Sequence, residues 1–162
     1  MPELPEITVI ASQMDRGLAG RVISAVDVVQ PKCLNVTVPE FAGGLVGTAF
    51  QSVGARGKWL FGRLEPGAHL LLNLGMGADL IWRPAGAKLP EKYQLSIMLD
   101  DGSGFTARFW WFGYAHFVPD GGLTSHRMTA ELGMSPLDPA FSVAHLAGLL
   151  KGRKTVKRKF RF

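Results

Sequence analysis

The sequence predicts an α+β protein that is mainly an antiparallel β-sandwich flanked by an N-terminal helix and a C-terminal helix. Three observations predict this class. The first 20 residues have a helical apolar period, residues 22–118 are short apolar or alternating runs, and a helical pattern returns after residue 137. Gly, Pro, Asp and Asn separate the short runs, which is typical of a sandwich or barrel.

The N-terminal helix is predicted from both its start and its period. Pro5 suits the first helical position and Glu6 the first turn, while Gly17 and Gly20 are stopping points. One apolar stripe at spacings of three and four is formed by Ile7, Ile10, Met14 and Leu18.

The strand region is predicted to contain hairpins. The runs that indicate strands are 22–29, 48–53, 59–64, 69–74, 94–99 and 104–112. Residues 65–67 and 100–102 are turn sequences between consecutive runs. Trp110 and Trp111 fall in the last run, where alternation predicts that one of them lies in the core.

The last helix is predicted to begin at Leu137-Asp138-Pro139, with Asp138 as the N-cap and Pro139 in the first turn. Phe141, His145 and Leu149 follow at intervals of four. We interpret His145 as a helix-surface residue rather than a ligand.

Composition excludes several classes of protein. The chain has 162 residues, 47% of them hydrophobic, so it is expected to be globular. Its one cysteine, Cys33, is interpreted as a small buried hydrophobe and excludes an internal disulfide or thiolate zinc cluster. No signal peptide or membrane-spanning run is visible, which predicts a cytoplasmic protein.

The net charge of +5 comes from one end of the chain. Residues 151–162 hold seven of the 18 basic residues and none of the 13 acidic ones, so the remainder has a net charge of −2. A basic tail fits a polyanion, and a solvated terminus fits equally well.

The N-terminus has the composition of a reactive site. Removal of Met1 would give Pro2 a free secondary amine, whose pKa near ~8 leaves a nucleophilic fraction at neutral pH. Such an amine forms an iminium with a carbonyl-like carbon. Glu3 is a candidate proton shuttle, and Glu6 lies one turn on, where it can hydrogen-bond the chain start.

These residues belong to a set of motifs that resembles one family. The motifs are Pro2–Glu6, Arg56–Phe61, Asn73–Gly77, Phe112–Gly113, Leu132–Leu137 and Lys154–Lys157. In this order they resemble the formamidopyrimidine-DNA glycosylase and endonuclease VIII family over essentially the whole chain.

The resemblance implies base-excision repair by a bifunctional DNA glycosylase and AP lyase that acts on oxidised bases. Pro2 would be the nucleophile, Glu3 the general acid and base, and Lys58 a catalytic residue that contacts phosphate near the lesion. Met76 and Phe112 would fill the gap left by an extruded nucleotide. The expected DNA-binding set is Glu6, Asn73, Met76, Trp110, Phe112 and Lys157.

The chain departs from the family pattern at two positions, Trp110 and Asn73. Trp110 replaces an arginine that pairs with the base opposite the lesion, so opposite-base preference is expected to be relaxed or altered. Asn73 replaces a histidine but keeps a hydrogen-bonding group.

The chain also ends where the family's second half begins. Residues 1–136 are predicted to be the catalytic sandwich, and 137–162 a linker and the start of a helical DNA-binding domain. The helix-two-turns-helix motif and the zinc finger would then be missing, so no cofactor is expected in this chain.

The predicted partner is double-stranded DNA with damaged or abasic sites, bound by a monomer. Two alternatives stay open: a damaged-DNA-binding module or inactive fragment without catalysis, and a structural sandwich whose partner is another protein.

Overall fold

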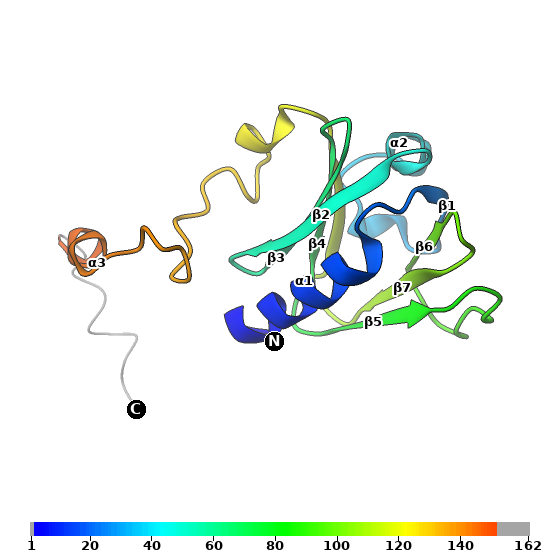
Figure 1. The fold of residues 1–162 in the computed structure, drawn as a ribbon, viewed down its shortest axis with the longest axis horizontal. Helices are drawn as coiled ribbons and strands as arrows, with labels where there is room; N and C mark the ends of the chain where they lie inside the picture. The colour runs from blue at the N-terminus through cyan, green and yellow to red at the C-terminus, as the bar shows by residue number, and fades with distance from the viewer. Residues whose placement is uncertain (1, 152–162) are drawn as a thin grey trace. The chain divides into compact units, whose positions relative to one another are not determined.

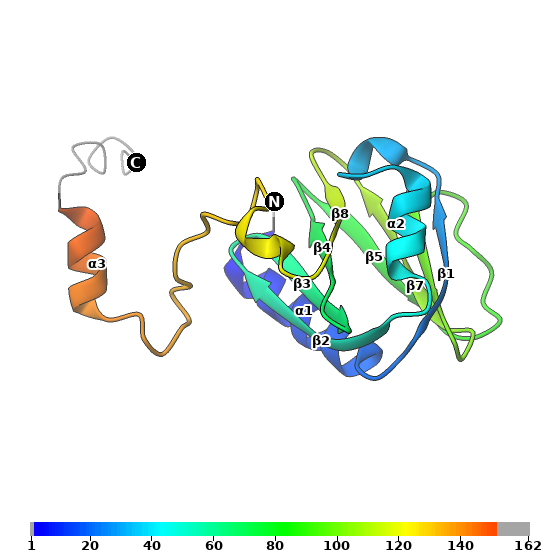
Figure 2. The same ribbon diagram turned by 90° about the horizontal axis from the view of Figure 1, so that it is seen from above.

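Two antiparallel four-stranded sheets form the body of the protein. The computed structural model describes residues 2–151. One sheet has the order β1 (Ile23–Val28), β6 (Leu95–Leu99), β7 (Gly104–Phe109), β5 (Ala78–Arg83). The other has the order β2 (Ala49–Arg56), β3 (Trp59–Glu65), β4 (His69–Asn73), β8 (Tyr114–Val118). Figures 1 and 2 show the sheets as separate layers, which confirms the predicted α+β sandwich.

Two helices cover the edges of the sandwich. The first, α1 (Leu4–Leu18), packs on β2 and β3 and lines a hollow of about 520 Å³ with residues of β5 and β7. The second, α2 (Val38–Leu45), contacts β1 and β8. Of the four edge strands, α1 therefore covers β2 and α2 contacts β1 and β8, while the hollow separates α1 from β5.

The predicted N-terminal helix is confirmed and begins one residue earlier than expected, at Leu4. A capping box explains the start: the Glu3 side chain accepts from the third helical backbone N–H, and Glu6 Oε2 accepts from the Glu3 N–H at 3.0 Å. Ile7 and Leu18 are buried, and the rest of the apolar stripe packs against the core.

The helix α2 was not predicted, because it lies inside the strand-rich region. Its sequence signal is a second capping box, in which the Thr37 hydroxyl accepts from the Glu40 N–H and Glu40 Oε2 accepts from the Thr37 N–H at 2.9 Å. Phe41 and Leu45 on this helix are fully buried.

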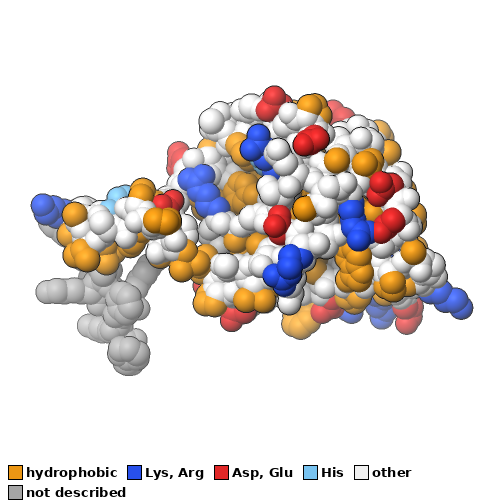
Figure 3. Space-filling model, viewed as in Figure 1, with side chains coloured by type: hydrophobic (Ala, Val, Ile, Leu, Met, Phe, Trp, Pro, Cys, Tyr) orange, Lys and Arg blue, Asp and Glu red, His pale blue; other side chains and the backbone are white. Residues whose placement is uncertain are grey.

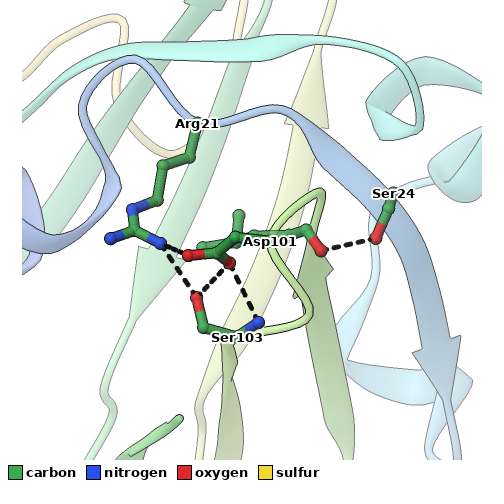
Figure 4. Close-up of polar contacts among 5 residues, drawn as sticks. Arg21, Ser24, Asp101 and Ser103 are labelled. Carbon is green, nitrogen blue, oxygen red and sulfur yellow. Dashed lines mark hydrogen bonds and ion pairs between the residues drawn. The ribbon is translucent and has the colours of Figure 1, made fainter. Parts of the chain in front are cut away.

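The predicted turns join the predicted hairpins, with β3 paired to β4 and β6 paired to β7. The β6–β7 turn is also tied to the start of β1 by polar contacts (Figure 4). Arg21 forms an ion pair with Asp101 and its Nη1 lies 3.1 Å from Ser103 Oγ, while Ser24 Oγ donates to the Leu99 carbonyl at 2.8 Å. These contacts hold the turn against the α1–β1 connection.

The last predicted strand is shorter than expected, since β7 ends at Phe109 and not at residue 112. The prediction that either Trp110 or Trp111 lies in the core is therefore wrong: they are 59% and 67% exposed. The physical reason is the turn that follows. Phe112 has φ +54°, and a Cβ on Gly113 would lie 2.3 Å from the Phe109 ring, so the chain turns tightly there.

Two short 3-10 helices complete this part of the chain, η1 (Pro31–Cys33) and η2 (Gly122–Thr124). Cys33 is buried in the core, as predicted, and burial raises the pKa of its thiol. On the face seen in Figure 3, Lys and Arg side chains lie interspersed with Asp and Glu side chains. This face has no patch of a single charge sign.

The chain divides into two compact units, and the second begins at Leu132. Its helix, α3 (Val143–Leu150), starts five residues later than the predicted N-cap at Asp138. The N-cap is Ser142, whose side chain accepts from the His145 N–H at 3.1 Å. Asp138 instead closes a turn, accepting from the Ala140 N–H at 2.8 Å. In the described part of the chain, no helix is long and apolar enough to cross a membrane.

A chain of neutral polar groups joins the segment after η2 to β8. His116 Nδ1 lies 2.9 Å from His126 Nε2, and His126 Nδ1 lies 2.7 Å from Thr129 Oγ1. Trp59 packs on both imidazole rings. Burial, with a smaller effect of His126, lowers the pKa of His116 to about 4.

This cluster predicts a loss of stability in mild acid. The unfolded chain binds a proton at His116 near pH 6.5 and the folded chain only near pH 4, so stability is full above 6.5 and falls between these values. The expected loss is about 3 kcal/mol. Urea unfolding at pH 7.0 and 4.5 measures it, and His116→Phe should reduce the slope, to which His126 and His69 also contribute because burial lowers their pKa values. An unchanged slope in that variant would contradict the assignment.

Candidate functional site

The strand register brings three separate sequence motifs to one end of a sheet. Trp59 of β3 pairs with Asn73 of β4, and Asn73 pairs with Tyr114 of β8. Lys58 precedes Trp59, the loop 74–77 follows Asn73, and the loop 110–113 precedes Tyr114. All three segments therefore emerge at the same end of the sheet. The helix α1 begins at this end too, since Glu3 contacts Lys58.

The start of α1 holds a small polar cluster beside Pro2. Lys58 Nζ lies 2.9 Å from Glu3 Oε1, with the two side chains 41% and 60% exposed. Glu6 accepts from the Glu3 backbone N–H. Pro2, which is half-buried, directly precedes these residues. The structure thus places together Pro2, Glu3, Glu6 and Lys58, four of the predicted site residues.

A carboxylate held by an ammonium group is suited to two roles. Its contact with Lys58 orients it, so it can take a proton from an amine or a sugar carbon that lies within reach. The positive end of the α1 dipole and Lys58 together favour a phosphate nearby. The cluster is exposed enough for a large ligand to approach.

Two loops next to this cluster are joined by backbone hydrogen bonds. The Met76 N–H donates to the Trp111 carbonyl and the Trp110 N–H donates to the Gly77 carbonyl, each at 2.9 Å. Met76 and Phe112 are 55% and 69% exposed. Large apolar side chains presented outward on braced backbone form a surface that can enter a stack of bases.

Asn73 supports the first of these loops. Its Oδ1 accepts from the Gly75 N–H at 2.9 Å, which fixes the turn after β4. Within residues 2–151 its amide nitrogen makes no hydrogen bond and remains free to donate to a ligand.

Some of the predicted site residues fall outside the part of the chain that the structure describes. Lys157 and the basic tail after Lys151 lie outside the described residues, as does Met1. Among residues 2–151, no group of three or more His, Cys, Asp or Glu side chains could hold a metal ion. A four-cysteine zinc site does not fit this chain, since its sequence has one cysteine.

Three residues near the site were missed by the sequence reasoning. Asp79 Oδ2 accepts from the Trp110 indole N–H at 3.3 Å, and the Gln94 side chain bonds both the N–H and the carbonyl of Phe109. Trp111 is exposed beside them. The contacts of Asp79 and Gln94 with residues 109 and 110 depend on strand pairing, so no local sequence signal marks them.

Comparison with known proteins identifies one family. The family model described as formamidopyrimidine-DNA glycosylase N-terminal domain matches residues 1–110. A formamidopyrimidine-DNA glycosylase of Acidiphilium cryptum is 37% identical over 160 residues, covering 96% of this chain and 56% of that protein. One of Rhodococcus jostii is 34% identical over 170 residues, covering 98% of this chain and 57% of that protein. The chain thus spans little more than half the length of these relatives.

Solved structures share the fold. The Lactococcus lactis formamidopyrimidine-DNA glycosylase bound non-covalently to DNA containing an AP site has a TM-score of 0.66 at 20% identity, covering 72% of this chain and 45% of that one. The wild-type enzyme of the same organism with DNA containing N7-benzyl-Fapy-dG has a TM-score of 0.67 at 21% identity, covering 72% and 44%. The chain belongs to the formamidopyrimidine-DNA glycosylase family, whose N-terminal domain it contains.

Proposed function

We propose that this chain carries the catalytic site of a DNA glycosylase and AP lyase that removes oxidised bases in base-excision repair. One observation carries the proposal: Glu3, Glu6 and Lys58 surround the start of the chain at Pro2, beside the loops that present Met76 and Phe112. The residues that would serve as nucleophile, proton shuttle, phosphate contact and wedge in this reaction therefore lie at one end of the sandwich.

The proposed reaction begins once Met1 is removed. The lone pair of the Pro2 amine forms a bond to C1′ of the damaged nucleotide while the glycosidic bond breaks, and the base leaves with that electron pair and takes up a proton. The Pro2 nitrogen then loses its proton, and the C1′–O4′ bond breaks as O4′ is protonated, which opens the sugar ring and leaves an iminium at C1′. The iminium acidifies the C2′ hydrogen. Glu3 takes that proton, and the C3′–oxygen bond breaks with its electrons leaving on the 3′ phosphate, which nicks the strand. This amine chemistry needs no cofactor.

The remaining residues would bind and position DNA. Lys58 and Asn73 are suited to phosphate contacts, and Met76 and Phe112 to the space left when a nucleotide is extruded. Lys157 would add a further phosphate contact. We propose residues 1–136 as the catalytic domain and 137–162 as the link to a DNA-binding region, acting as a cytoplasmic, nucleoid-associated monomer.

Borohydride trapping tests the function. The 161-residue chain that remains after loss of Met1, checked by mass, is incubated with a duplex that contains one abasic site, and borohydride reduces any iminium to a stable adduct. We expect a covalent protein–DNA band with abasic DNA and none with the undamaged duplex. Salt-sensitive binding without an adduct would instead identify a non-catalytic DNA-binding module. Absence of both would overturn the proposal.

A further inference from the structure

The hollow of about 520 Å³ between α1 and the edge strand β5 lies apart from the start of α1, since its first lining residue on that helix is Ile10. We propose that it binds a small aromatic anion. A flat ring system fills the apolar interior, and a carboxylate, sulfonate or phosphate group lies beside Arg16 at the mouth. The volume is in the range of small-molecule sites. The site is separate from the proposed catalytic function and does not depend on it.

One face of α1 forms the first wall of the hollow. Ile10, Met14 and Gly17 follow at spacings of four and three, so they lie on the same face of the helix. Gly17 adds no side chain, and Ala78 on the facing strand β5 adds only a methyl group. Packed side chains normally fill such a space. These two small residues explain why the helix and the strand do not close on each other.

Two aromatic side chains form part of the opposite wall. Trp82 of β5 and Phe105 of β7 are directly paired in the register of the sheet, so their side chains lie on the same face. Phe105 and Leu18 are buried, whereas Trp82 is 45% exposed. The lining therefore runs from buried residues to an exposed aromatic edge. This is the shape of a pocket for a small molecule and not of a flat protein interface.

The indole of Trp82 is held in place by its neighbours. A Cβ on Gly17 would lie 3.6 Å from the ring, which is ordinary van der Waals contact, so the ring lies close to the helix backbone. The guanidinium carbon of Arg21 lies 5.7 Å from the ring centroid. Arg21 is itself held by its ion pair with Asp101 (Figure 4). A ring that is already ordered loses little conformational entropy when a flat ligand packs on it.

The charge of the lining favours an anion. Among the described residues that line the hollow, Arg16 is the only charged one, and none is acidic. Arg16 is exposed, donates to Ser12 Oγ at 2.8 Å and has no ion-pair partner within residues 2–151. A guanidinium has several N–H donors, so Arg16 keeps donors for a ligand. Gln13 adds an uncharged hydrogen-bonding group. The lining is thus complementary to an aromatic ring that carries a negative group.

Fluorescence titration of the full chain with two probes tests the proposal. Anilinonaphthalene sulfonate is a flat aromatic anion, and phenylnaphthylamine has the same rings without the sulfonate. We expect the wild type to bind one molecule of either probe, the sulfonate about two- to fivefold more tightly. Arg16→Gln should abolish this difference, because it weakens binding of the sulfonate alone.

A second variant fills the hollow. Gly17→Leu places a side chain in it, so both probes should bind at least about tenfold more weakly. The helix should tolerate this change, since leucine has a higher helix propensity than glycine. Gly43→Leu is the matched control and should bind like the wild type. Gly43 is an exposed glycine of α2, and a Cβ there would meet no atom of a distant residue within 4 Å in the part of the chain that the structure describes.

Four outcomes would overturn the proposal. Absence of saturable binding by the wild type would show that only water fills the hollow. Unchanged binding by Gly17→Leu would place the probes elsewhere on the protein. An equal advantage of the sulfonate in the wild type and in Arg16→Gln would remove the case for an anion. Self-association that Gly17→Leu abolishes, with no probe bound, would identify a second copy of the chain as the occupant. Borohydride trapping is independent of all four, so the proposed function is tested separately.

Discussion

A chain that retains Met1 is expected to form no borohydride-trapped adduct with abasic DNA, a loss of more than about a thousandfold relative to the Met1-free chain. With Met1 attached, the Pro2 nitrogen is a tertiary amide whose lone pair is delocalised into the carbonyl, so it cannot attack C1′. An uncleavable N-terminal extension produces this form, and mass confirms it. The loops of Met76 and Phe112 are unaltered, so DNA binding should persist.

Glu3→Gln provides the graded comparison for this experiment. The variant keeps the amine and the side-chain shape but cannot shuttle a proton, so strand nicking should slow by about 10²- to 10⁴-fold. Its carboxamide oxygen can still face Lys58, which keeps the contact at the start of α1. Equal trapping by the Met1-retaining and Met1-free chains would contradict the role of Pro2, whatever the result for Glu3→Gln.

Local signals predicted those parts of the fold that depend on local chemistry. The N-terminal helix and the turns at 65–67 and 100–102 follow from periodicity and turn residues, and the structure confirms them. The helix α2 was missed although its Thr37–Glu40 capping box is visible in the sequence, because the surrounding residues indicate strands. The start of α3 was misplaced because Asp138-Pro139 fits a turn as well as an N-cap.

The site itself depends on pairing between distant residues. Family motifs placed Glu3, Lys58, Met76 and Phe112 in order along the chain, but only the register of β3, β4 and β8 shows that their segments share one end of the sheet. Exposure of Trp111 was not predictable from alternation, because the strand ends two residues before it. The alternation of apolar residues indicates where a strand can form, and tertiary contacts determine where it ends.

Because the loops depend on contacts between distant residues, Gly75 is the loop position where an added side chain would disturb them most. Its φ is +55°, and a Cβ there would lie 1.9 Å from the Trp111 carbonyl oxygen, 2.7 Å from the Phe112 carbonyl carbon and 2.8 Å from the Gly113 nitrogen. These are backbone atoms, so no side-chain rotation relieves the clash. Gly75→Ala must push the two loops apart and break the bond from the Met76 N–H to Trp111.

We expect Gly75→Ala to lower the free energy of unfolding by about 3–5 kcal/mol and to abolish binding to abasic DNA, because the wedge and the tryptophans lose their common support. Gly86→Ala is the matched control. Gly86 has φ +76°, but a Cβ there would meet no atom of a distant residue within 4 Å in the described part of the chain, so only backbone strain of about 1–2 kcal/mol applies. Urea unfolding and DNA titration of both variants separate clash from strain. If both variants lose the same stability and the same DNA binding, the two loops do not depend on their close approach at Gly75. Met76 and Phe112 must then be supported by other contacts.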